Sequence, residues 1–364
     1  MTAPIRIFLG GDVMTGRGID QVMPLPVDPV LHEPWVQDAR TYVRLAEAAN
    51  GPIPRPIGPE YVWGDALAEL RRTDVDVRII NLETSITLSE AHWTGKVIHY
   101  RMHPGNVECL TAAAIDCCCL ANNHVLDWGR EGLAETLRTL DAAGLRYAGA
   151  GPDAPQAAVP AVLPAPGKGR VLVFSAGTPC SGIPREWCAR EARSGVRLLP
   201  DLSESTARQL GSEIRRVKHP GDVAVLSVHW GGNWGYEVPA EQVEFAHRLI
   251  EEGVDLVHGH SSHHVKPLEI YRERLILYGC GDFINDYEGI RGYEQYRSDL
   301  RLMFLLRLDP ETGQFLQARL VPLQARRFRL HRATEADAQW LCDLLNGLGS
   351  PISLEGDYCL LLHR

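Results

Sequence analysis

The sequence predicts an α/β fold, and three observations carry this prediction. Short apolar runs rich in β-branched residues recur along the chain, helical patterns lie between them, and each run ends at a polar residue. Such continuous apolar runs are typical of strands that are buried on both faces. The runs are residues 5–12 (IRIFLGGD), 76–83 (DVRIINLE), 115–124 (IDCCCLANNH), 222–230 (DVAVLSVHW) and 254–260 (VDLVHGH).

Helical patterns separate these runs. In residues 129–144 (GREGLAETLRTLDAAG) and 239–253 (PAEQVEFAHRLIEEG), apolar residues recur every three or four positions, which gives each helix one apolar face. Strands that alternate with helices favour an α/β architecture. We expect residues 1–330 to form one catalytic domain. Residues 331–364 (containing EADAQWLCDLLNGLG and DYCLLLHR) are expected to add a helix and a strand packed on the same body.

The composition is that of a globular protein, with 45% hydrophobic and 23% charged residues among 364. The net charge is −9 and no block of Lys or Arg occurs, so we do not expect nucleic-acid binding. The N-terminus lacks a secretory signal pattern, and no apolar run approaches the roughly 20 residues that cross a bilayer. We therefore expect a soluble, cytoplasmic protein without a membrane partner. Its nine cysteines, three of them adjacent at Cys117–Cys119, are expected to be reduced and mostly buried.

The polar residues at the strand ends are the functional signal. In an open α/β sheet the ligand crevice lies at the carboxyl ends of the strands, so these residues are expected to meet. Carboxylates, carboxamides and imidazoles suit Mn, Fe, Zn, Mg or Ca. We therefore expect a divalent metal site. The strand-end residues are Asp12, Asn81, Glu83, Asn122, Asn123, His124, Asp127, His229, His260 and His263.

Each of these residues alone has a simpler interpretation. Asp12 could cap a helix, Asn122 and Asn123 could be turn residues, and His229 could be a core histidine bonded to the backbone. Their joint occurrence at five strand ends favours one shared site.

Six motifs resemble, in order, those of CapA-like proteins, which are named for poly-γ-glutamate capsule synthesis and are a branch of the calcineurin-like metallophosphoesterase superfamily. The motifs are GDVMTGR, NLETSIT, LANNHVLDWG, VHWGGNWGYEV, GHSSHHVKPLEIY and LYGCGDFI, spread over residues 5–325. The resemblance implies a sandwich of two β-sheets flanked by helices, with one or two divalent metal ions at the strand ends. It implies His124 as the catalytic histidine. The implied metal ligands are Asp12, Glu83, Asn123, His229, His260 and His263.

The sequence departs from the superfamily's pattern at several positions. The resembled enzymes have Asp-x-His in the first motif, but here Met14 replaces the histidine, which removes one ligand of a two-metal centre. A single-ion site is therefore expected to be possible, and phosphatase activity is in doubt. Glu83 stands where an aspartate is usual, two serines separate His260 from His263, and Asp282 in the GDF motif adds a carboxylate near the centre.

Other residues suggest acid–base chemistry. His124 and Asp127 are expected to form a dyad in which the carboxylate fixes the imidazole tautomer. His99 and Asp282 are further candidates for proton transfer. Lys96 and Arg101 are expected to bind a substrate carboxylate. The alternative is that residues 92–103 form a solvated loop.

Three functions remain open on the sequence. The first is a metal-dependent enzyme that acts on a peptide or peptide-like substrate by acid–base chemistry, as the lasso-peptide epimerases of the resembled family do. The second is a metal-dependent hydrolase of phosphoesters or γ-glutamyl amides. The third is an accessory protein of poly-γ-glutamate synthesis. The sequence does not determine the oligomeric state.

Overall fold

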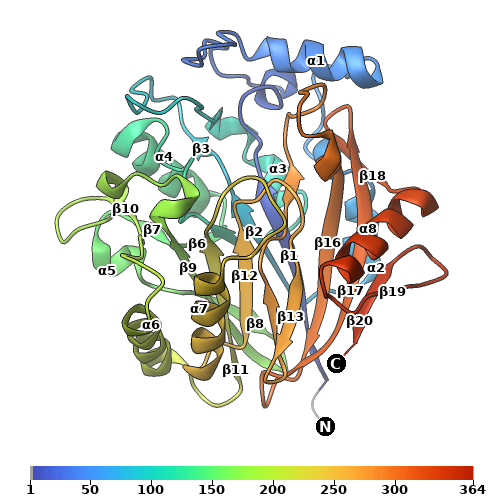
Figure 1. Cartoon of the computed structure of the whole chain (residues 1–364). Coiled ribbons are helices and arrows are strands. Elements are labelled where there is room, and N and C mark those ends of the chain that lie inside the picture. Colours follow the sequence, from blue (N-terminus) through green and yellow to red (C-terminus); the bar gives the residue numbers. More distant parts are fainter. Residues whose placement is uncertain (1–2, 364) are drawn as a thin grey trace.

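Two β-sheets packed face to face, with helices on their outer faces, form the body of the protein (Figure 1). The computed structural model describes residues 3–363. The larger sheet has ten strands in the order β19-β20-β17-β16-β1-β2-β5-β6, with β15 beside β1 and β18 beside β17. The smaller has six, in the order β13-β14-β12-β11-β9-β8. The predicted sandwich of two sheets flanked by helices is confirmed.

The bounds of the elements follow. The larger sheet contains β1 (Ile5–Val13), β2 (Val77–Leu82), β5 (Cys117–Cys119), β6 (Arg146–Ala148), β15 (Asp282–Ile284), β16 (Leu300–Leu308), β17 (Phe315–Arg326), β18 (Arg329–Arg332), β19 (Ser353–Leu354) and β20 (Leu360–His363). The smaller sheet contains β8 (Ala161–Ala165), β9 (Gly169–Gly177), β11 (Asp222–His229), β12 (Leu256–His260), β13 (Leu268–Tyr271) and β14 (Arg274–Leu277). Two short pairs are β3 (Ser85–Ile86) with β4 (Arg101–Met102), and β7 (Ala150–Gly151) with β10 (Gly195–Val196). The α-helices are α1 (Arg40–Asn50), α2 (Asp65–Arg72), α3 (Glu108–Thr111), α4 (Gly129–Ala142), α5 (Ala154–Ala157), α6 (Glu204–Val217), α7 (Ala240–Glu251) and α8 (Glu335–Gly347).

Three apolar layers hold the sandwich together. The inner layer joins the facing sides of the two sheets and includes Ile7 of β1 and Val225 of β11. A second layer packs α1 to α4 on the outer face of the larger sheet, and a third packs α6 and α7 on the outer face of the smaller sheet. Alternation along β5 places Cys117 and Cys119 in the inner layer and Cys118 in the outer one. All nine cysteines are unpaired and seven are buried, as predicted.

Both sheets have a parallel core. Strand β1 runs parallel to β2, which runs parallel to β5, and β11 runs parallel to both β9 and β12. The carboxyl ends of these strands therefore lie at the same end of the sandwich. The C-terminal part of the larger sheet is antiparallel, because β16, β17 and β18 follow one another through short connections.

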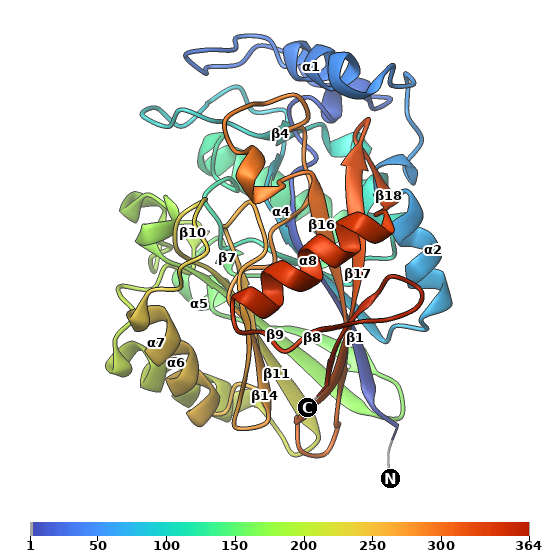
Figure 2. The ribbon, with the colours of Figure 1, turned by 45° about the vertical axis from the view of Figure 1, so that its right-hand side comes forward.

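The chain beyond residue 330 is joined to the larger sheet. Strand β20 pairs with β17, and α8 contributes Leu341 and Leu345 to the inner apolar layer. Figure 2 shows α8 lying across the β16 and β17 end of that sheet. Among residues 3–363, no helix combines the length and apolar character that crossing a bilayer requires.

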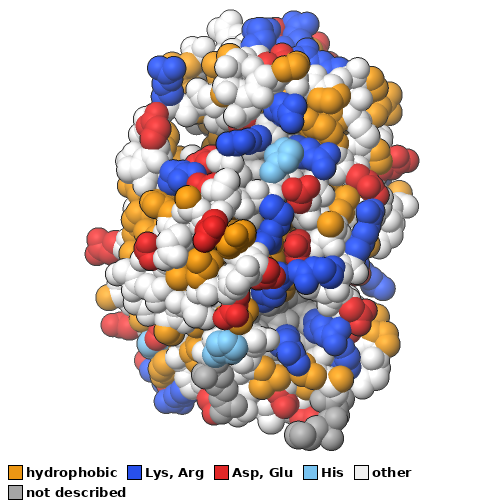
Figure 3. Space-filling view, turned by 90° about the vertical axis from the view of Figure 1, so that its right-hand side faces the viewer, with side chains coloured by type: hydrophobic (Ala, Val, Ile, Leu, Met, Phe, Trp, Pro, Cys, Tyr) orange, Lys and Arg blue, Asp and Glu red, His pale blue; other side chains and the backbone are white. Residues whose placement is uncertain are grey.

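Charged groups of both signs are interspersed on the surface. Figure 3 shows Lys and Arg side chains mixed with Asp and Glu over one face of the molecule. Acidic side chains lie between the basic ones on the described part of that face.

Helix α8 begins with a capping box, which gives a prediction for stability. The Thr334 hydroxyl accepts a hydrogen bond from the Asp337 amide at 3.2 Å, and the Asp337 carboxylate accepts one from the Thr334 amide at 3.3 Å. Thr334→Ala should lower the free energy of unfolding by about 1 kcal/mol, because an amide at the helix start loses its acceptor. Urea unfolding measures this change. Thr334→Ser keeps the acceptor and serves as the control, and an equal loss in both variants would contradict the capping role.

Candidate metal centre

Two overlapping groups of metal-ligand side chains lie where the strand ends meet. The first consists of Asp12 at the end of β1, His229 at the end of β11 and His260 at the end of β12. The second consists of Asp12, His263 and Asp282. Within each group one ligand atom per residue lies within 4.8 Å of the others, and Asp12 belongs to both. The sandwich thus brings an acid of the larger sheet against histidines of the smaller one.

A close approach of two strands places the two aspartates together. Asp12 of β1 and Asp282 of β15 are paired in register on parallel strands. A side chain at Gly11 would put its Cβ 1.7 Å from the carbonyl oxygen of Gly281, so only glycine allows this separation. The local sequences GGD and GCGD therefore account for the pairing of the two carboxylates.

The carboxylates of the centre are crowded and buried. Burial, with the nearby Asp282 charge, raises the pKa of Asp12 to about 8, and burial together with Asp12 raises the pKa of Glu83 well above its usual value. The amide of Asn81 donates to Asp12 Oδ1 at 2.7 Å and to Glu83 Oε2 at 2.5 Å. The other oxygen, Asp12 Oδ2, is buried and has no hydrogen-bond partner among the described residues. A divalent cation at this oxygen would offset both the burial and the repulsion.

The histidines of the centre form a chain of contacts with Ser227 and two oxygen atoms. His229 Nδ1 lies 2.7 Å from His260 Nδ1, and burial holds the pKa of both imidazoles well below the usual value, so both are neutral at pH 7. Five contacts connect the members of this chain, whose two ends are oxygens that accept hydrogen bonds. In order, the chain is Gly10 O, His258, Ser227 Oγ, His260, His229 and Asn123 Oδ1.

The ring nitrogens His229 Nδ1 and His260 Nδ1 face each other in this chain. A cation between His229, His260 and Asp12 would accept a lone pair from each imidazole. Glu83 Oε1 lies 3.5 Å from His229 Nε2, the ring nitrogen that also contacts Asn123 Oδ1. The donor set thus fits a divalent ion.

The predicted dyad is formed beside the centre. His124 Nδ1 lies 2.6 Å from Asp127 Oδ2. Asp127 also accepts hydrogen bonds from Lys96 Nζ at 2.5 Å and from the Tyr100 amide at 2.7 Å. Burial would raise the pKa of Asp127, but His124 and Lys96 outweigh it and hold that pKa below its usual value. Because Asp127 occupies Nδ1, the Nε2 atom of His124 is the nitrogen available to a substrate. Burial lowers the pKa of His124 to about 4, so this imidazole is neutral at pH 7.

Three residues that the sequence suggested for substrate binding or proton transfer have partners within the protein. Lys96 Nζ contacts Asp127 and the backbone oxygen of Asn123. Arg101 donates to the carbonyl oxygens of Ser89 and Asp28, and its guanidinium lies over the Trp128 ring.

His99 Nε2 contacts the Trp93 carbonyl, and its ring packs against His32, His92 and Trp128. His99 Nδ1 and Arg101 Nε are buried and have no hydrogen-bond partner among the described residues. The predicted roles of Lys96 and Arg101 in substrate binding and of His99 in proton transfer stay predictions. Within the segment, residues 99–102 are buried, whereas residues 94, 95 and 97 are exposed.

Two residues behind the ligands were not singled out from the sequence. Ser227 bridges His258 and His260. Side chains alternate between the two faces of a strand, so Ser227 lies on the same face of β11 as His229. This two-residue spacing could have identified Ser227 from the sequence. Arg301 donates to Asn285 Oδ1 at 2.8 Å, and Asn285 donates to Asp282 Oδ2 at 2.5 Å. No sequence motif indicates the contact between Arg301 and Asn285.

A cavity of about 270 Å³ adjoins the centre at His263. Trp35 and Trp234 line it, whereas Trp63 and Trp187 are fully buried in the core. Arg17 also lines it. Its guanidinium is paired with Asp286 and Glu33, so it offers no free charge to an anion. The cavity therefore favours an uncharged or aromatic group.

Comparisons with known proteins place these motifs in a family. A family model described as bacterial capsule synthesis protein PGA_cap matches residues 6–287. A probable polyglutamine synthesis accessory protein of Mycobacterium tuberculosis is 48% identical over 338 residues, covering 93% of this chain and 89% of that protein. The PGA biosynthesis protein CapA of Bacillus subtilis is 25% identical over 70% of this chain and 62% of its own length. The capsule biosynthesis protein CapA of Bacillus anthracis is 25% identical over 63% of this chain and 54% of its own length. The chain belongs to the PGA_cap family of bacterial capsule synthesis proteins.

Proposed function

We propose that this protein is a metal-dependent enzyme that acts on a peptide-like substrate by acid–base chemistry, with epimerisation of one residue as its reaction. The observation that carries the proposal is the buried group of Asp12, His229 and His260 beside the His124–Asp127 pair, in which one Asp12 oxygen has no hydrogen-bond partner among residues 3–363. A buried acid with a raised pKa beside two imidazoles with lowered pKa values supports a bound cation. A neutral histidine with one free nitrogen supports proton transfer.

A divalent cation would be held by Asp12, His229 and His260, with Glu83 and Asn123 beside the Nε2 atom of His229. It would supply stabilisation for negative charge on a substrate carbonyl oxygen. The residues of the chain carry out the proton transfer. His124 Nε2 accepts the proton from the carbon next to that carbonyl. Asp127 keeps the imidazole in the tautomer that has a lone pair on Nε2. Water from the cavity beside His263 returns a proton to the other face of the carbon, and His124 releases its own to solvent.

Lys96 acts as a positioning residue in this proposal. Its ammonium group neutralises Asp127, which is fully buried, and so holds the carboxylate against His124. The positive charge of Lys96 also keeps the pKa of the His124 imidazole low, after burial itself.

Hydrolysis of a phosphoester or a γ-glutamyl amide is the second candidate function. It is favoured by the second ligand group, because two ions that share a carboxylate can stabilise both the attacking and the leaving oxygen. The family membership and the names of the relatives also support an accessory role in polyglutamate synthesis. That role is compatible with either chemistry.

The two reactions are distinguished by incubating the metal-loaded protein with candidate peptides in heavy water. Epimerisation should raise the peptide mass by one deuterium without cleavage, whereas hydrolysis should give shorter products or free phosphate.

Asp12→Ala and His229→Ala should lose bound metal, because each removes a ligand from the buried group. His124→Ala should keep the metal and lose about 10² to 10⁴-fold in turnover. Normal turnover in His124→Ala would refute the role of the dyad.

Replacing Lys96 separates positioning from substrate binding. Lys96→Met should lower the free energy of unfolding by about 3 kcal/mol without any substrate present, because the buried Asp127 carboxylate loses its positively charged partner. It should also lower kcat. Binding of a substrate carboxylate would instead raise KM and leave stability unchanged. Lys168→Met is the matched control, since Lys168 forms a similarly buried pair with Asp76 at the opposite strand ends. The control should lose stability and keep kcat.

A further inference from the structure

We infer that the cavity lined by Asn285 and Arg301 binds a carboxylate of a peptide-like ligand, and that Arg301 recognises this group. The inference rests on the proposed function for the kind of ligand. It adds an anionic group that is bound away from the reacting carbon.

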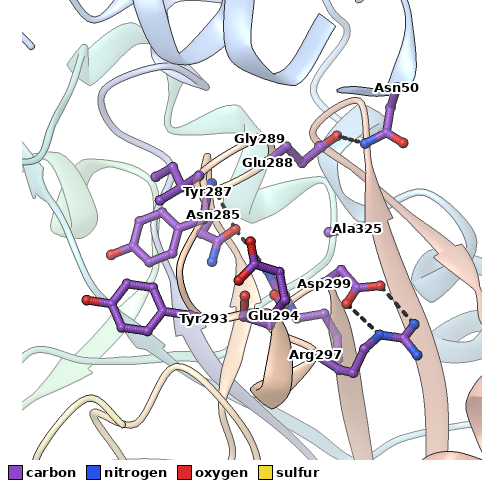
Figure 4. Close-up of a pocket in the computed structure, with 13 residues that line it drawn as sticks. Asn50, Asn285, Tyr287, Glu288, Gly289, Tyr293, Glu294, Arg297, Asp299 and Ala325 are labelled. Carbon is purple, nitrogen blue, oxygen red and sulfur yellow. Dashed lines mark hydrogen bonds and ion pairs between the residues drawn. The ribbon is translucent and has the colours of Figure 1, made fainter. Parts of the chain in front are cut away.

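The cavity has a volume of about 310 Å³ and is lined by segments remote in the chain (Figure 4). Asn285 and Arg301 form its buried part, each with 2% exposure. Tyr293 and Glu294 also line it and are exposed, so the cavity is open to solvent. It adjoins the cavity at His263, and the site therefore lies beside the proposed metal centre. The residues that line both cavities are Tyr287, Ile290, Tyr293 and Ser298.

Arg301 is a buried arginine that has no acidic partner. Its guanidinium donates to the carbonyl oxygens of Ser298 and Leu300 and to Asn285 Oδ1 at 2.8 Å, which are all neutral acceptors. Its Nε atom is buried and has no hydrogen-bond partner among residues 3–363. Burial lowers the pKa of Arg301, although the charge of Asp282 and of other acids at longer range opposes this. A buried charge of this kind is stabilised when an opposite charge joins it.

Arg17 shows how the fold completes a buried arginine with its own acids. Arg17 Nε and Nη2 donate to the two carboxylate oxygens of Asp286 at 2.9 and 2.6 Å, and Nη1 donates to Glu33 at 2.9 Å. In Arg301 the same two nitrogens, Nε and Nη2, make a single hydrogen bond, to the amide oxygen of Asn285. Arginine presents these nitrogens as a fork that matches a carboxylate. Arg301 therefore lacks the acid that Arg17 has.

The acids that line the cavity have other partners. Figure 4 shows the Glu288 carboxylate turned toward Asn50, whose side chain donates to it at 2.7 Å. The backbone amides of residues 327 and 328 also donate to Glu288. Asp299 is held by Arg297 through Nε at 3.0 Å and Nη2 at 3.1 Å. Glu294 is exposed, so solvent screens its charge. The lining acids thus leave the buried guanidinium unpaired.

The carboxylate is tested with three probes that differ in one group, on the full-length protein as purified. N-acetylglutamate α-amide carries a side-chain carboxylate, N-acetylglutamine carries a terminal carboxylate, and N-acetylglutamine α-amide carries neither. Nuclear magnetic resonance titration should show that one of the first two binds about tenfold more tightly than the third, because a charged hydrogen-bonded pair forms. The tighter of the two shows whether the site takes an acidic side chain or a chain terminus.

Replacing the guanidinium assigns the binding to Arg301. Arg301→Met should abolish the preference for a carboxylate, and Arg301→Lys should weaken it, because an ammonium group lacks the fork. Circular dichroism checks that both variants are folded. Arg101 is the competing position, since it also donates only to carbonyl oxygens, with its guanidinium over the Trp128 ring. Loss of the preference in Arg101→Met, with the preference kept in Arg301→Met, would overturn the inference.

The charge of Glu294 gives a test that needs no buried substitution. Glu294→Gln removes a negative charge from the exposed part of the lining and should tighten binding of the preferred probe about twofold. Glu241→Gln is the matched control, because Glu241 is an exposed acid at the start of α7 that is not part of the lining. It should leave binding unchanged.

Three results contradict the inference. They are equal or undetectable binding of the probes by the wild type, a preference kept by folded Arg301→Met, and an unchanged affinity in Glu294→Gln. If Arg301→Met is unfolded, the comparison of Glu294→Gln with Glu241→Gln decides. These titrations involve no turnover, so their failure leaves the proposed function to the heavy-water experiment, and absence of deuterium uptake leaves the binding result intact.

Discussion

The burial of acids from one sheet against imidazoles from the other is the constraint on which the site depends. The two sheets pack through a continuous apolar layer, and their parallel strands all end at the same edge. Asp12 and His260 therefore meet in a region that water does not reach. In that environment a carboxylate resists ionisation and an imidazole resists protonation. A bound cation, as proposed above, would favour the charged carboxylate and leave a lone pair on each imidazole for coordination.

The strand ends were predictable because they follow from a single rule. Continuous apolar runs buried on both faces give strands β1, β2, β11 and β12 close to their observed bounds. The polar residues that end these runs lie at the shared edge. The run expected over residues 115–124 is a shorter strand, Cys117–Cys119. Asn122 accepts hydrogen bonds from the amides of His124 and Val125, and this turn ends the strand early. The same turn directs His124 toward Asp127.

The sequence was a weaker guide to partners that depend on contacts between distant segments. Lys96 and Arg101 carry charges that suit a substrate carboxylate, but burial forces such charges to find partners within the protein. Their partners lie on other segments, at Asp127 and at the backbone of Asp28 and Ser89. Likewise, the pairing of Asp282 with Asp12 depends on β15 lying beside β1, a contact between segments remote in the chain. The local sequence around Asp12 contains no information about which strand lies beside β1.

The wide sequence separation of the site residues has a consequence for biosynthesis. Asp12 leaves the ribosome well before His229 and His260, which end strands β11 and β12. A nascent chain therefore displays Asp12 long before the buried group of the three residues can assemble. Any cation that this group binds would be captured only after β12 has been made, so the cellular site of maturation would have a part in deciding which element is installed.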